Sequence, residues 1–514
     1  SVSETFSRRH IDSLLWNCAV HNSMRPIRSQ LVLVRVLSDG NRRMFASTNP
    51  PPPAVFPTKL RRPHPSFTAT STTLWYPPSM EPITSAYLHL PFCRRRCHYC
   101  DFAISLVGDD AESHIALQGM RRYVDFLIRE IALTPYSSST GDFEGGDQPP
   151  LRTVFFGGGT PSLLPPDLLG RVIEALRERF GIDPDAEISM EMDPGTFDAE
   201  KLTQYVDLGV NRVSLGLQSF DANVLKWAGR GHTLEQSREA IAAVRANRGV
   251  ERWSLDLISG MPGLTKKAWS DSLKEAVDVA PHHISVYDLQ IEEETLFGTW
   301  YNSSRFGKNG KNKTMVSNLN SHMARPELPS EDESAEMFHM ASKTLRDAGY
   351  EHYEVSSYAK VGSRCAHNQV YWTGRQGWYG FGMSATSFTA HGKQFARPRK
   401  MRDYEAYVEA MAAFIDEPSR ACTIKSSFEA RADALLERLM LGLRTRNGVD
   451  LVHLRQDFGD AVLAEIVSAV RAGWPEELVE MDDYRLTLSD PGGMLVSTQL
   501  ISTLMARVSS LHTP

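Results

Sequence analysis

Three cysteines lie within eight residues of this 514-residue chain, at Cys93, Cys97 and Cys100. The spacing CxxxCxxC offers three thiolate ligands, and a [4Fe-4S] cubane held by three thiolates keeps one iron open for a small molecule such as S-adenosylmethionine (SAM). A zinc site is the alternative. Structural zinc usually takes four closed ligands in two separated pairs, however, and the chain has no second CxxC. The spacing therefore favours an iron–sulfur cluster.

The residues around these cysteines suit a loop that holds a negatively charged cluster. Ala86–Leu90 has the alternation of a short strand and Pro91 ends it, so the cysteines follow on a loop. Arg94–Arg96 can offset the negative charge of a thiolate-bound cluster. The other cysteines lie far from this loop and from one another, at Cys18, Cys365 and Cys422. Such sparse cysteines predict a reducing compartment and no disulfide framework.

The segment Tyr87–Phe102, YLHLPFCRRRCHYCDF, resembles the opening motif of radical-SAM proteins of the oxygen-independent coproporphyrinogen III oxidase superfamily. It is most similar to the heme chaperone (HemW-type) branch, which includes organellar members. The resemblance runs from about Ala86 to about Tyr404 and is weaker beyond. It implies a [4Fe-4S] cluster, SAM and an incomplete (β/α)6 barrel that is open on one side.

Composition indicates a globular chain with one unusual end. The 41% hydrophobic and 23% charged residues suffice for a barrel-sized domain and a smaller companion. No stretch reaches the roughly 18 uninterrupted apolar residues of a membrane span. The formal net charge of −6 does not favour binding to the negatively charged backbone of nucleic acid. Residues 1–80 differ, with ten Lys or Arg and three acids, against 46 basic and 59 acidic residues in the rest.

Residues 1–80 are also rich in Ser, Thr, Arg and Pro, and the run Asn49–Pro53 favours polyproline or irregular structure. This composition is typical of a transit peptide, for a mitochondrion in preference to a plastid, with cleavage expected before Met80. The alternative is a disordered extension or sequence outside the natural protein, since the chain starts at Ser1. A cytoplasmic location would then follow.

From residue 85 onward, candidate strands and helices alternate. Short runs rich in Val, Ile and Leu predict six strands, at Ala86–Leu90, Arg152–Phe156, Glu187–Met192, Arg212–Leu217, Trp253–Ile258 and His283–Leu289. Helical patterns lie between them at Tyr123–Leu133, Asp167–Phe180, Asp198–Leu208, Leu234–Arg245 and Lys267–Val279. Six consecutive βα units predict an α/β fold with a parallel barrel, in agreement with the resemblance.

In a parallel barrel, functional side chains gather where the strands end. Gly157–Pro161, GGGTP, follows the second strand, and its glycines let the backbone approach a ligand, although a tight strand–helix turn is equally typical. Later strands carry Glu191, Gln218 and Asp256, whose carboxylates and amide suit ribose hydroxyls and an ammonium. A structural ion pair, for example Glu191 with Arg212, is the alternative role.

The resemblance assigns SAM contacts to these residues. In radical-SAM relatives the segment matching Gly158, Gly159 and Thr160 binds the amino group of the SAM methionine moiety. The other contacts it implies are Glu191, Gln218 and Asp256, Arg230 facing the SAM carboxylate, and Tyr87 and Tyr99 flanking cluster and cofactor. The chemistry it implies is reductive cleavage of SAM, in which an electron from an external low-potential donor leads to a 5′-deoxyadenosyl radical.

Two features bear on what such a radical would attack. Coproporphyrinogen oxidases of this superfamily typically carry a further cysteine two residues beyond the third ligand, where this chain has Phe102. The segment Cys365–Trp372 matches the HNxxYW motif of the heme-binding branch. The heme contacts that this resemblance implies are His367 as axial ligand, Cys365 as a competing ligand, and Tyr371 and Trp372.

The residues alone leave the role of His367 open, because a histidine beside Asn, Tyr and Trp is more often a hydrogen-bonded packing residue. Glycines follow in Trp378–Gly382. They either allow a flat macrocycle to lie near the backbone or form a turn.

These observations predict five parts: a transit-peptide-like segment at 1–80, a radical-SAM partial barrel at 81–300, a surface insertion at 301–332, barrel completion with the HNxxYW region at 333–400, and a mainly helical C-terminal lobe at 401–514. The insertion contains the polar stretch Ser303–Arg325, and Ser138–Pro150 is a similar loop. In the lobe, Ala432–Leu443 predicts a helix, and Arg485–Leu488 with the following glycine pair predicts a hairpin. This pattern is compatible with a winged helix, but the acidic balance argues against nucleic acid as a partner.

Two functions are compatible with these parts. The preferred one is a heme chaperone that binds heme, uses cluster and SAM for regulation or redox-linked release, and hands heme to respiratory hemoproteins. Peripheral association with a membrane would then come through the recipient. The alternative is an oxygen-independent coproporphyrinogen III oxidase of porphyrin metabolism. No catalytic residue is assigned, and whether the chain is an enzyme stays open.

Overall fold

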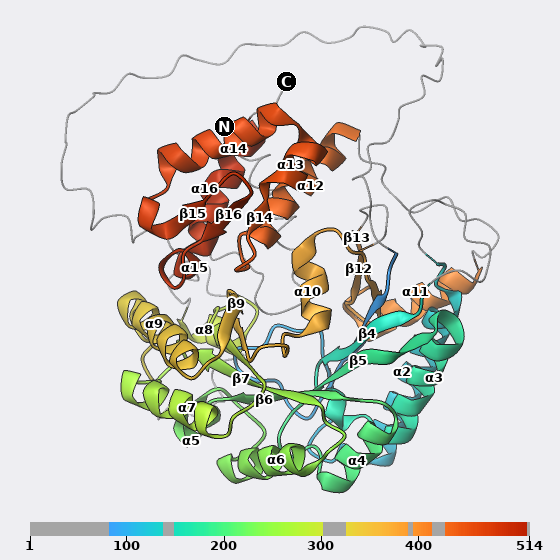
Figure 1. Cartoon of the computed structure of the whole chain (residues 1–514). Helices are drawn as coiled ribbons and strands as arrows, with labels where there is room; N and C mark the ends of the chain where they lie inside the picture. The colour runs from blue at the N-terminus through green and yellow to red at the C-terminus, as the bar shows by residue number, and fades with distance from the viewer. Residues whose placement is uncertain (1–81, 137–148, 302–324, 389–393, 414–426, 511–514) are drawn as a thin grey trace, which may run out of the picture.

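The computed structural model describes residues 82–136, 149–301, 325–388, 394–413 and 427–510 (Figure 1). The transit-peptide-like segment 1–80, its cleavage point, Cys18 and Cys422 therefore lie outside the described residues. The same holds for 137–148 and 302–324, which make up most of the two expected surface loops. No helix in the described ranges is both long and apolar enough to span a membrane.

The centre of the molecule is a nine-stranded sheet in the order β11-β1-β4-β5-β6-β7-β8-β10-β9. The strands are β1 (Ser85–Leu90), β4 (Leu151–Gly158), β5 (Ile182–Met192), β6 (Arg212–Gln218), β7 (Arg252–Ser259), β8 (His283–Asp288), β9 (Glu351–Glu354), β10 (Ser357–Ala359) and β11 (Tyr379–Phe381). All pairs from β11 to β8 are parallel, and β10 and β9 are antiparallel. The six predicted strands are confirmed as the parallel core of this sheet.

Helices cover the outer face of the curved sheet (Figure 1). They are α2 (His114–Leu133), α3 (Pro166–Phe180), α4 (Ala199–Asp207), α5 (Ala222–Trp227), α6 (Leu234–Ala246), α7 (Lys266–Asp278), α8 (Leu296–Tyr301) and α9 (Glu331–Asp347). The five predicted helices are confirmed, with α2 beginning nine residues earlier than expected because the Ser113 hydroxyl caps its first turn. The fold is thus a run of six βα units.

Burial explains why these segments form strands and helices. Every residue of β1 is buried, and the inward faces of α2 and α3 bury residues such as Leu127 and Leu176 completely. Removing each such side chain from water stabilises the fold by about 1.5–3 kcal/mol. The sheet does not close, because its end strands β11 and β9 do not pair with each other. The expectation of an incomplete barrel, open on one side, is confirmed.

The C-terminal lobe has a separate core (Figure 1). Its elements are α12 (Ser427–Gly442), β14 (Val449–Asp450), α13 (Leu451–Phe458), α14 (Asp460–Gly473), β15 (Val479–Met481), β16 (Arg485–Leu488), α15 (Gly492–Leu495) and α16 (Ser497–Ser510). The three strands form an antiparallel sheet in the order β14-β16-β15. Helices joined to a small antiparallel sheet match the expected helical lobe.

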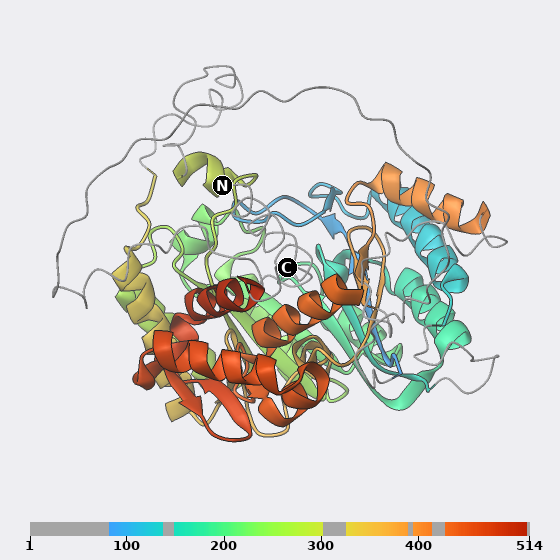
Figure 2. The ribbon, with the colours of Figure 1, turned by 90° about the horizontal axis from the view of Figure 1, so that it is seen from above.

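Two details of the lobe differ from the sequence-based prediction. β16 pairs with the preceding β15, and the glycine pair Gly492–Gly493 begins α15 instead of forming a hairpin turn. The turn is made by Asp482, whose carboxylate accepts hydrogen bonds from the N–H groups of Tyr484 and Arg485. In addition, α11 (Met401–Ala413), on the lobe side of the predicted boundary at 401, packs on α2 in the barrel core (Figure 2).

Two short segments connect barrel and lobe. The hairpin β12 (Thr386–Phe388) and β13 (Gln394–Ala396) follows β11. Helix α10 (Ala366–Thr373) contacts β4 and β5 on one side and α12 on the other (Figure 1). The HNxxYW motif lies on α10 and therefore at the junction between barrel and lobe.

Candidate cluster and cofactor site

The three cysteines lie on a closed loop at the carboxyl end of β1. The short strands β2 (Phe92–Cys93) and β3 (Ser105–Leu106) pair in parallel at the base of this loop. The N–H of Ser105 donates to the carbonyl of Pro91 at 2.7 Å, and that of Val107 donates to the carbonyl of Cys93 at 2.9 Å. Pro91 thus ends β1 and also helps to close the loop that carries the thiols.

His98, between the second and third cysteines, anchors the far end of the loop. Its backbone N–H donates to Ala228 at 2.9 Å, and its Nδ1–H donates to the carbonyl of Trp227 at 2.8 Å. Its own carbonyl accepts from the N–H of Phe297 at 2.9 Å. The loop is therefore held by α5 and α8, two short helices that the sequence patterns did not predict.

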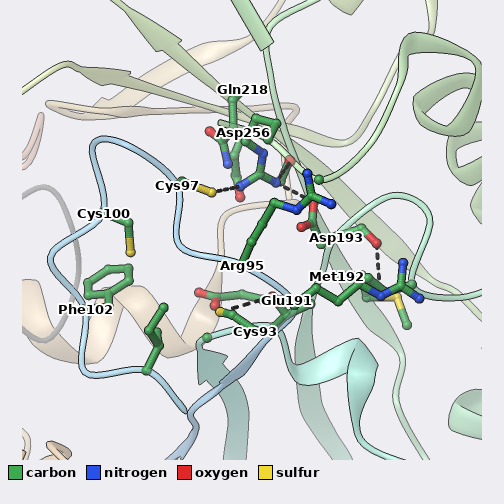
Figure 3. A pocket seen from close by; sticks show the side chains of 18 of the residues that line it. Cys93, Arg95, Cys97, Cys100, Phe102, Glu191, Met192, Asp193, Gln218 and Asp256 are labelled. Atoms are coloured by element: carbon green, nitrogen blue, oxygen red, sulfur yellow. Dashed lines mark hydrogen bonds and ion pairs between the residues drawn. The ribbon is translucent and has the colours of Figure 1, made fainter. Parts of the chain in front are cut away.

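A cavity of about 150 Å³ opens beside this loop at the carboxyl ends of the strands (Figure 3). Eleven of the predicted site residues line it: Cys93, Cys97, Tyr99, Cys100, Gly158, Gly159, Thr160, Glu191, Gln218, Arg230 and Asp256. Residues from four strands and the cysteine loop thus face one space, as expected for a parallel barrel. Tyr87 does not line it. Its ring is buried and stacks on Phe155, and its hydroxyl donates to Nδ1 of His89 at 3.2 Å.

The arrangement of the thiols bears on the choice between a cluster and zinc. Structural zinc usually takes four closed ligands, whereas three thiols on one loop suit a cluster in which each sulfur bonds a different iron. Burial is the main cause that raises the pKa of Cys93 to about 11 and that of Cys100 to about 12. Iron binding, which requires thiolates, would therefore release protons.

A positive charge outside the cysteine loop, that of Arg230, lies against one of the thiols. Arg230 donates to Sγ of Cys97 at 3.4 Å, to the Tyr99 hydroxyl at 3.2 Å and to the carbonyl of Gly216 at 2.7 Å, and it pairs with Asp193. Burial is the largest single influence on the pKa of Asp193 and acts to raise it, but the charge of Arg230 and the hydrogen bond with His232 together outweigh burial, and the pKa lies below its usual value. Asp193 is a site residue that the sequence analysis missed, two residues beyond Glu191.

The three arginines of the loop do not act as one charged group. Arg94 and Arg95 line the cavity, and Arg94 donates to the carbonyl of Gly195 at 2.9 Å. Arg95 pairs with exposed Asp109 at 2.8 Å. Arg96 donates to two carbonyls of its own loop and does not line the cavity. Arg96 thus stabilises the loop, and its charge also lowers the pKa of the neighbouring Cys100 thiol against the larger effect of burial.

Two carboxyl groups, each largely removed from water, lie in the wall of the cavity. Burial, followed by the charge of Asp256, raises the pKa of Glu191 to about 8. Burial likewise raises the pKa of Asp256 to about 6, although Ser214 donates to both of its oxygens at 3.0 and 3.2 Å. The ion pair considered for Glu191 is wrong, because Arg212 pairs with Glu187 at 3.6 Å. Glu191 accepts a hydrogen bond from Gly158 N–H at 3.1 Å and faces the cavity.

Gln218 shows a feature typical of a binding residue. It is a non-glycine residue at φ 72°, next to a register shift between β6 and β7 after Leu215. Such a conformation costs about 1–2 kcal/mol and persists only where the surroundings enforce it. The shift turns the amide into the cavity, where its buried Oε1 has no hydrogen-bond partner. An acceptor of this kind fits a ligand that carries hydroxyl or ammonium donors.

The glycines of the GGGTP motif serve packing. A Cβ on Gly158, which has φ 113°, would lie 2.5 Å from the ring of His89, and one on Gly159 would lie 2.6 Å from the backbone of Pro91. The motif therefore allows the strand end to lie directly against the chain that leads to Cys93. The Thr160 hydroxyl follows and donates to Sγ of Cys93 at 3.5 Å.

The HNxxYW residues lie elsewhere. His367 is fully buried near the amino ends of β4 and β5, where its Nδ1 lies 2.8 Å from the Thr153 hydroxyl and its Nε2 lies 2.8 Å from the Tyr371 hydroxyl. Cys365 is buried and donates to Glu187 at 3.6 Å. Tyr371 and Trp372 belong to the core of the C-terminal lobe. None of the four lines the cluster cavity, and heme ligation by His367 would require that one of its two hydrogen bonds break.

The glycines of Trp378–Gly382 likewise contact protein. A Cβ on Gly380 would lie 2.2 Å from the carbonyl of Thr386, and one on Gly382 would lie 2.4 Å from the Tyr123 hydroxyl. Of the two roles considered for these glycines, the structure supports tight packing against the β12 hairpin and α2.

Comparison with known proteins agrees with this geometry. Residues 87–276 match the Radical SAM superfamily and residues 430–495 match the HemN C-terminal domain. The heme chaperone HemW of Synechocystis is 38% identical over 439 residues, which cover 82% of this chain and 96% of that protein. The chain belongs to the HemW family.

Other HemW relatives extend this result. HemW of Bacillus subtilis is 29% identical over 80% of this chain and 96% of its own length. Mouse radical S-adenosyl methionine domain-containing protein 1, mitochondrial, is 28% identical over 85% of this chain and 91% of its own length. Among solved structures, coproporphyrinogen III oxidase (HemN) of Escherichia coli superposes with a TM-score of 0.62 at 21% identity, covering 84% of this chain and 91% of that one. This likeness shows the shared fold.

Proposed function

We propose that this HemW-family chain is a heme chaperone that carries a [4Fe-4S] cluster and SAM, binds heme and hands it to respiratory hemoproteins. The observation that carries the proposal is the cavity in which three thiols and an orphaned amide acceptor meet, in a chain whose relatives are named heme chaperones. The ring of Phe102 lines this cavity at the position where coproporphyrinogen oxidases are expected to carry a further cysteine. An apolar ring there supports the chaperone over the oxidase.

The residues of the cavity divide into two groups. Cys93, Cys97 and Cys100 would hold the cluster, and the guanidinium of Arg230 beside Cys97 stabilises negative charge on that sulfur. The SAM moiety would be held by Gly158, Gly159, Thr160, Glu191, Gln218 and Asp256. Arg230 also supplies the positive charge for the SAM carboxylate. When bound, cluster and SAM supply one-electron cleavage of the sulfonium bond to a 5′-deoxyadenosyl radical.

Location and partners follow from the same proposal. We place the protein in the mitochondrion, with the plastid as the alternative, because the mouse relative is named mitochondrial and residues 1–80 have the composition of a transit peptide. A low-potential donor would supply the electron, and the recipient would bring the protein to the membrane. Import of the full chain into isolated organelles tests the location, and failure in both mitochondria and plastids would overturn it.

The function is tested by two assays on one anaerobic preparation with reconstituted cluster. A heme titration should give stoichiometric binding and a Soret band, and transfer to an apo-hemoprotein should follow. Incubation with coproporphyrinogen III, SAM and reductant should yield no protoporphyrinogen. Turnover in the second assay would establish the oxidase and overturn the chaperone proposal.

A further inference from the structure

A second cavity, of about 230 Å³, lies between α10 and the C-terminal lobe. Its walls come from α10, α12, α13 and the strands β9, β14 and β16. It shares no lining residue with the cluster cavity. The residues assigned to the cluster and to SAM therefore leave this space without a role.

The lining of this cavity is basic, although the chain as a whole is acidic. Four arginines and a single acid, Asp450, line it, and the arginines are Arg364, Arg375, Arg438 and Arg485. Two carboxylates behind the lining hold two of them. Glu351 pairs with Arg364 at 2.6 Å, and Asp457 pairs with Arg438 at 3.1 Å.

The carboxylate of Asp457 is shared by two guanidinium groups. Besides Arg438, it lies 4.0 Å from Arg375. Burial is the main cause that lowers the pKa of Arg438, and the like charge of Arg375 acts in the same direction, against the charge of Asp457. Nε of Arg438 is buried without a hydrogen-bond partner. Among the described residues the guanidinium of Arg375 also has none, and its side chain is 29% exposed. An anion in the cavity would balance this charge.

The size and polarity of the cavity limit what this anion can be. The apolar side chains of its lining, Trp372 and Val449, are 8% and 1% exposed and pack in the core of the lobe. They offer no open face to a ring. Gln369, Thr373 and Asn447 add polar groups. The volume is below the range of about 300–1,000 Å³ that is typical of sites for drug-sized ligands. The ligand is therefore compact and polar.

The arrangement of the arginines favours phosphate over carboxylate. They come from different elements, since Arg364 precedes α10 and Arg375 follows it, whereas Arg438 lies on α12 and Arg485 on β16. Guanidinium groups bind the oxygens of both anions, often through two parallel hydrogen bonds. A carboxylate presents its two oxygens in one plane. A phosphate presents oxygens in several directions and so suits donors that surround a cavity.

We propose that this cavity binds a compact phosphate anion, either free phosphate or the phosphate group of a small soluble metabolite, with Arg375 and Arg438 as its main contacts. The inference goes beyond the proposed function, because it requires neither the cluster, SAM nor heme. Glu351, which holds Arg364, belongs to the barrel sheet, whereas Arg438 and Arg485 belong to the lobe. Bound phosphate would thus connect barrel and lobe and stabilise the folded chain.

The test is isothermal titration calorimetry of the cluster-loaded full chain with inorganic phosphate, in a phosphate-free buffer of fixed ionic strength. We expect a single phosphate per chain. Arg375→Gln should weaken binding about tenfold or more, which corresponds to at least about 1.4 kcal/mol. The matched control is Arg446→Gln, because Arg446 is 60% exposed, lies near Glu351 and does not line the cavity. It removes the same charge and should change the affinity by less than about twofold, since salt screens an exposed charge.

Thermal denaturation provides a second measurement. Saturating phosphate should raise the Tm of wild type and of Arg446→Gln, but not that of Arg375→Gln. If Arg375→Gln does not fold, Arg485→Gln, at an exposed position of the lining, takes its place and should also weaken binding.

Two further ligands identify the chemistry of the site. Glycerol 3-phosphate that binds as tightly as inorganic phosphate would assign the site to phosphate esters, and weaker binding would assign it to free phosphate. Citrate, which carries only carboxylates, should bind more weakly than either. Tighter binding of citrate, an unchanged phosphate affinity in the folded arginine variants, or no phosphate binding by the wild type would overturn the proposal.

Discussion

The hydroxyl of Thr153, near the amino end of β4, lies 2.8 Å from Nδ1 of His367 on α10. The other ring nitrogen lies 2.8 Å from the Tyr371 hydroxyl, and the imidazole stacks on Phe155 at 5.2 Å between ring centroids. The histidine of the HNxxYW motif thus fixes α10 to the barrel. Since α10 also contacts α12, this bond helps to set the position of the C-terminal lobe.

Thr153→Val should therefore lower the free energy of unfolding by about 1–3 kcal/mol, because a buried ring nitrogen loses its partner. Urea denaturation followed by circular dichroism measures this change. Thr203→Val, on the exposed face of α4, is the control and should stay within about 0.5 kcal/mol of wild type. Equal stability of the two variants would show that the bond does not hold α10.

Replacing any of Cys93, Cys97 and Cys100 by Ala should abolish cluster assembly, because each thiol is expected to bond a separate iron. Iron and sulfide content and the visible absorbance after anaerobic reconstitution measure this. Cys365→Ala is the control, since this buried thiol contacts Glu187 away from the cavity, and it should retain the cluster. Zinc bound by the wild type in place of iron and sulfide would refute the cluster.

Gln218→Gly should separate stability from SAM binding. Glycine adopts φ 72° without strain, so the substitution removes a strain of about 1–2 kcal/mol from the folded state. Glycine also raises the entropy of the unfolded chain, and this lowers stability by about 0.4–1 kcal/mol. The variant should thus be more stable by up to about 1 kcal/mol, yet bind SAM more weakly. Ala280→Gly, at φ 53° on the surface, should give similar stabilisation and wild-type SAM binding, as measured by calorimetry. Unchanged SAM affinity in Gln218→Gly would remove that residue from the binding site.

Glu191 should make stability depend on pH. Burial, followed by the charge of Asp256, raises its pKa from 4.5 to about 8, so between these values the folded chain keeps a proton that the unfolded chain has lost. The contribution to stability is complete below pH 4.5 and falls as pH rises towards 8, by at most about 1.4 kcal/mol per pH unit. Glu191→Gln should show a flatter profile in urea denaturation from pH 5 to 8. Parallel profiles would contradict the assignment.

The affinity for SAM should depend on the protonation of the Glu191 carboxyl group. An ammonium beside Glu191 favours the charged form, so binding should release a proton and affinity should rise with pH up to about 8. Calorimetry in two buffers of different ionisation enthalpy measures the released proton, and Glu191→Gln should release less.

The ion pair between Arg397 and Glu130 should contribute strongly to stability. Both side chains are buried, 2.6 Å apart, and Glu130 also accepts from the Tyr404 hydroxyl and the N–H of Gly382. Arg397→Met leaves an uncompensated buried carboxylate and should cost about 3–5 kcal/mol. The pair of exposed Arg122 with Glu405 is the control, and Arg122→Met should change stability little, because water screens a surface ion pair. Similar losses in thermal denaturation would contradict this difference.

Local sequence patterns were sufficient to predict most of the secondary structure and the cysteine loop. The six parallel strands, five of the helices and the cysteine loop were predictable because alternation, helical periodicity and the CxxxCxxC spacing each extend over a few neighbouring residues. That the residues after successive strands meet in one cavity followed from the geometry of parallel sheets. The family, too, could be read from the motif at Tyr87–Phe102.

Only the tertiary structure decided which distant residues become partners. Arg230 reaches Cys97 across 133 residues, and Arg212 pairs with Glu187 instead of Glu191, because strand register and side-chain direction select the partner and leave no local trace. The strands β9, β10 and β11 have only three or four residues, too few for a recognisable alternation; β10 and β11 pair with the edges of β8 and β1, and β9 pairs with β10. For the same reason the sequence predicted a ligand role for His367, whereas packing buries that ring between Thr153 and Tyr371.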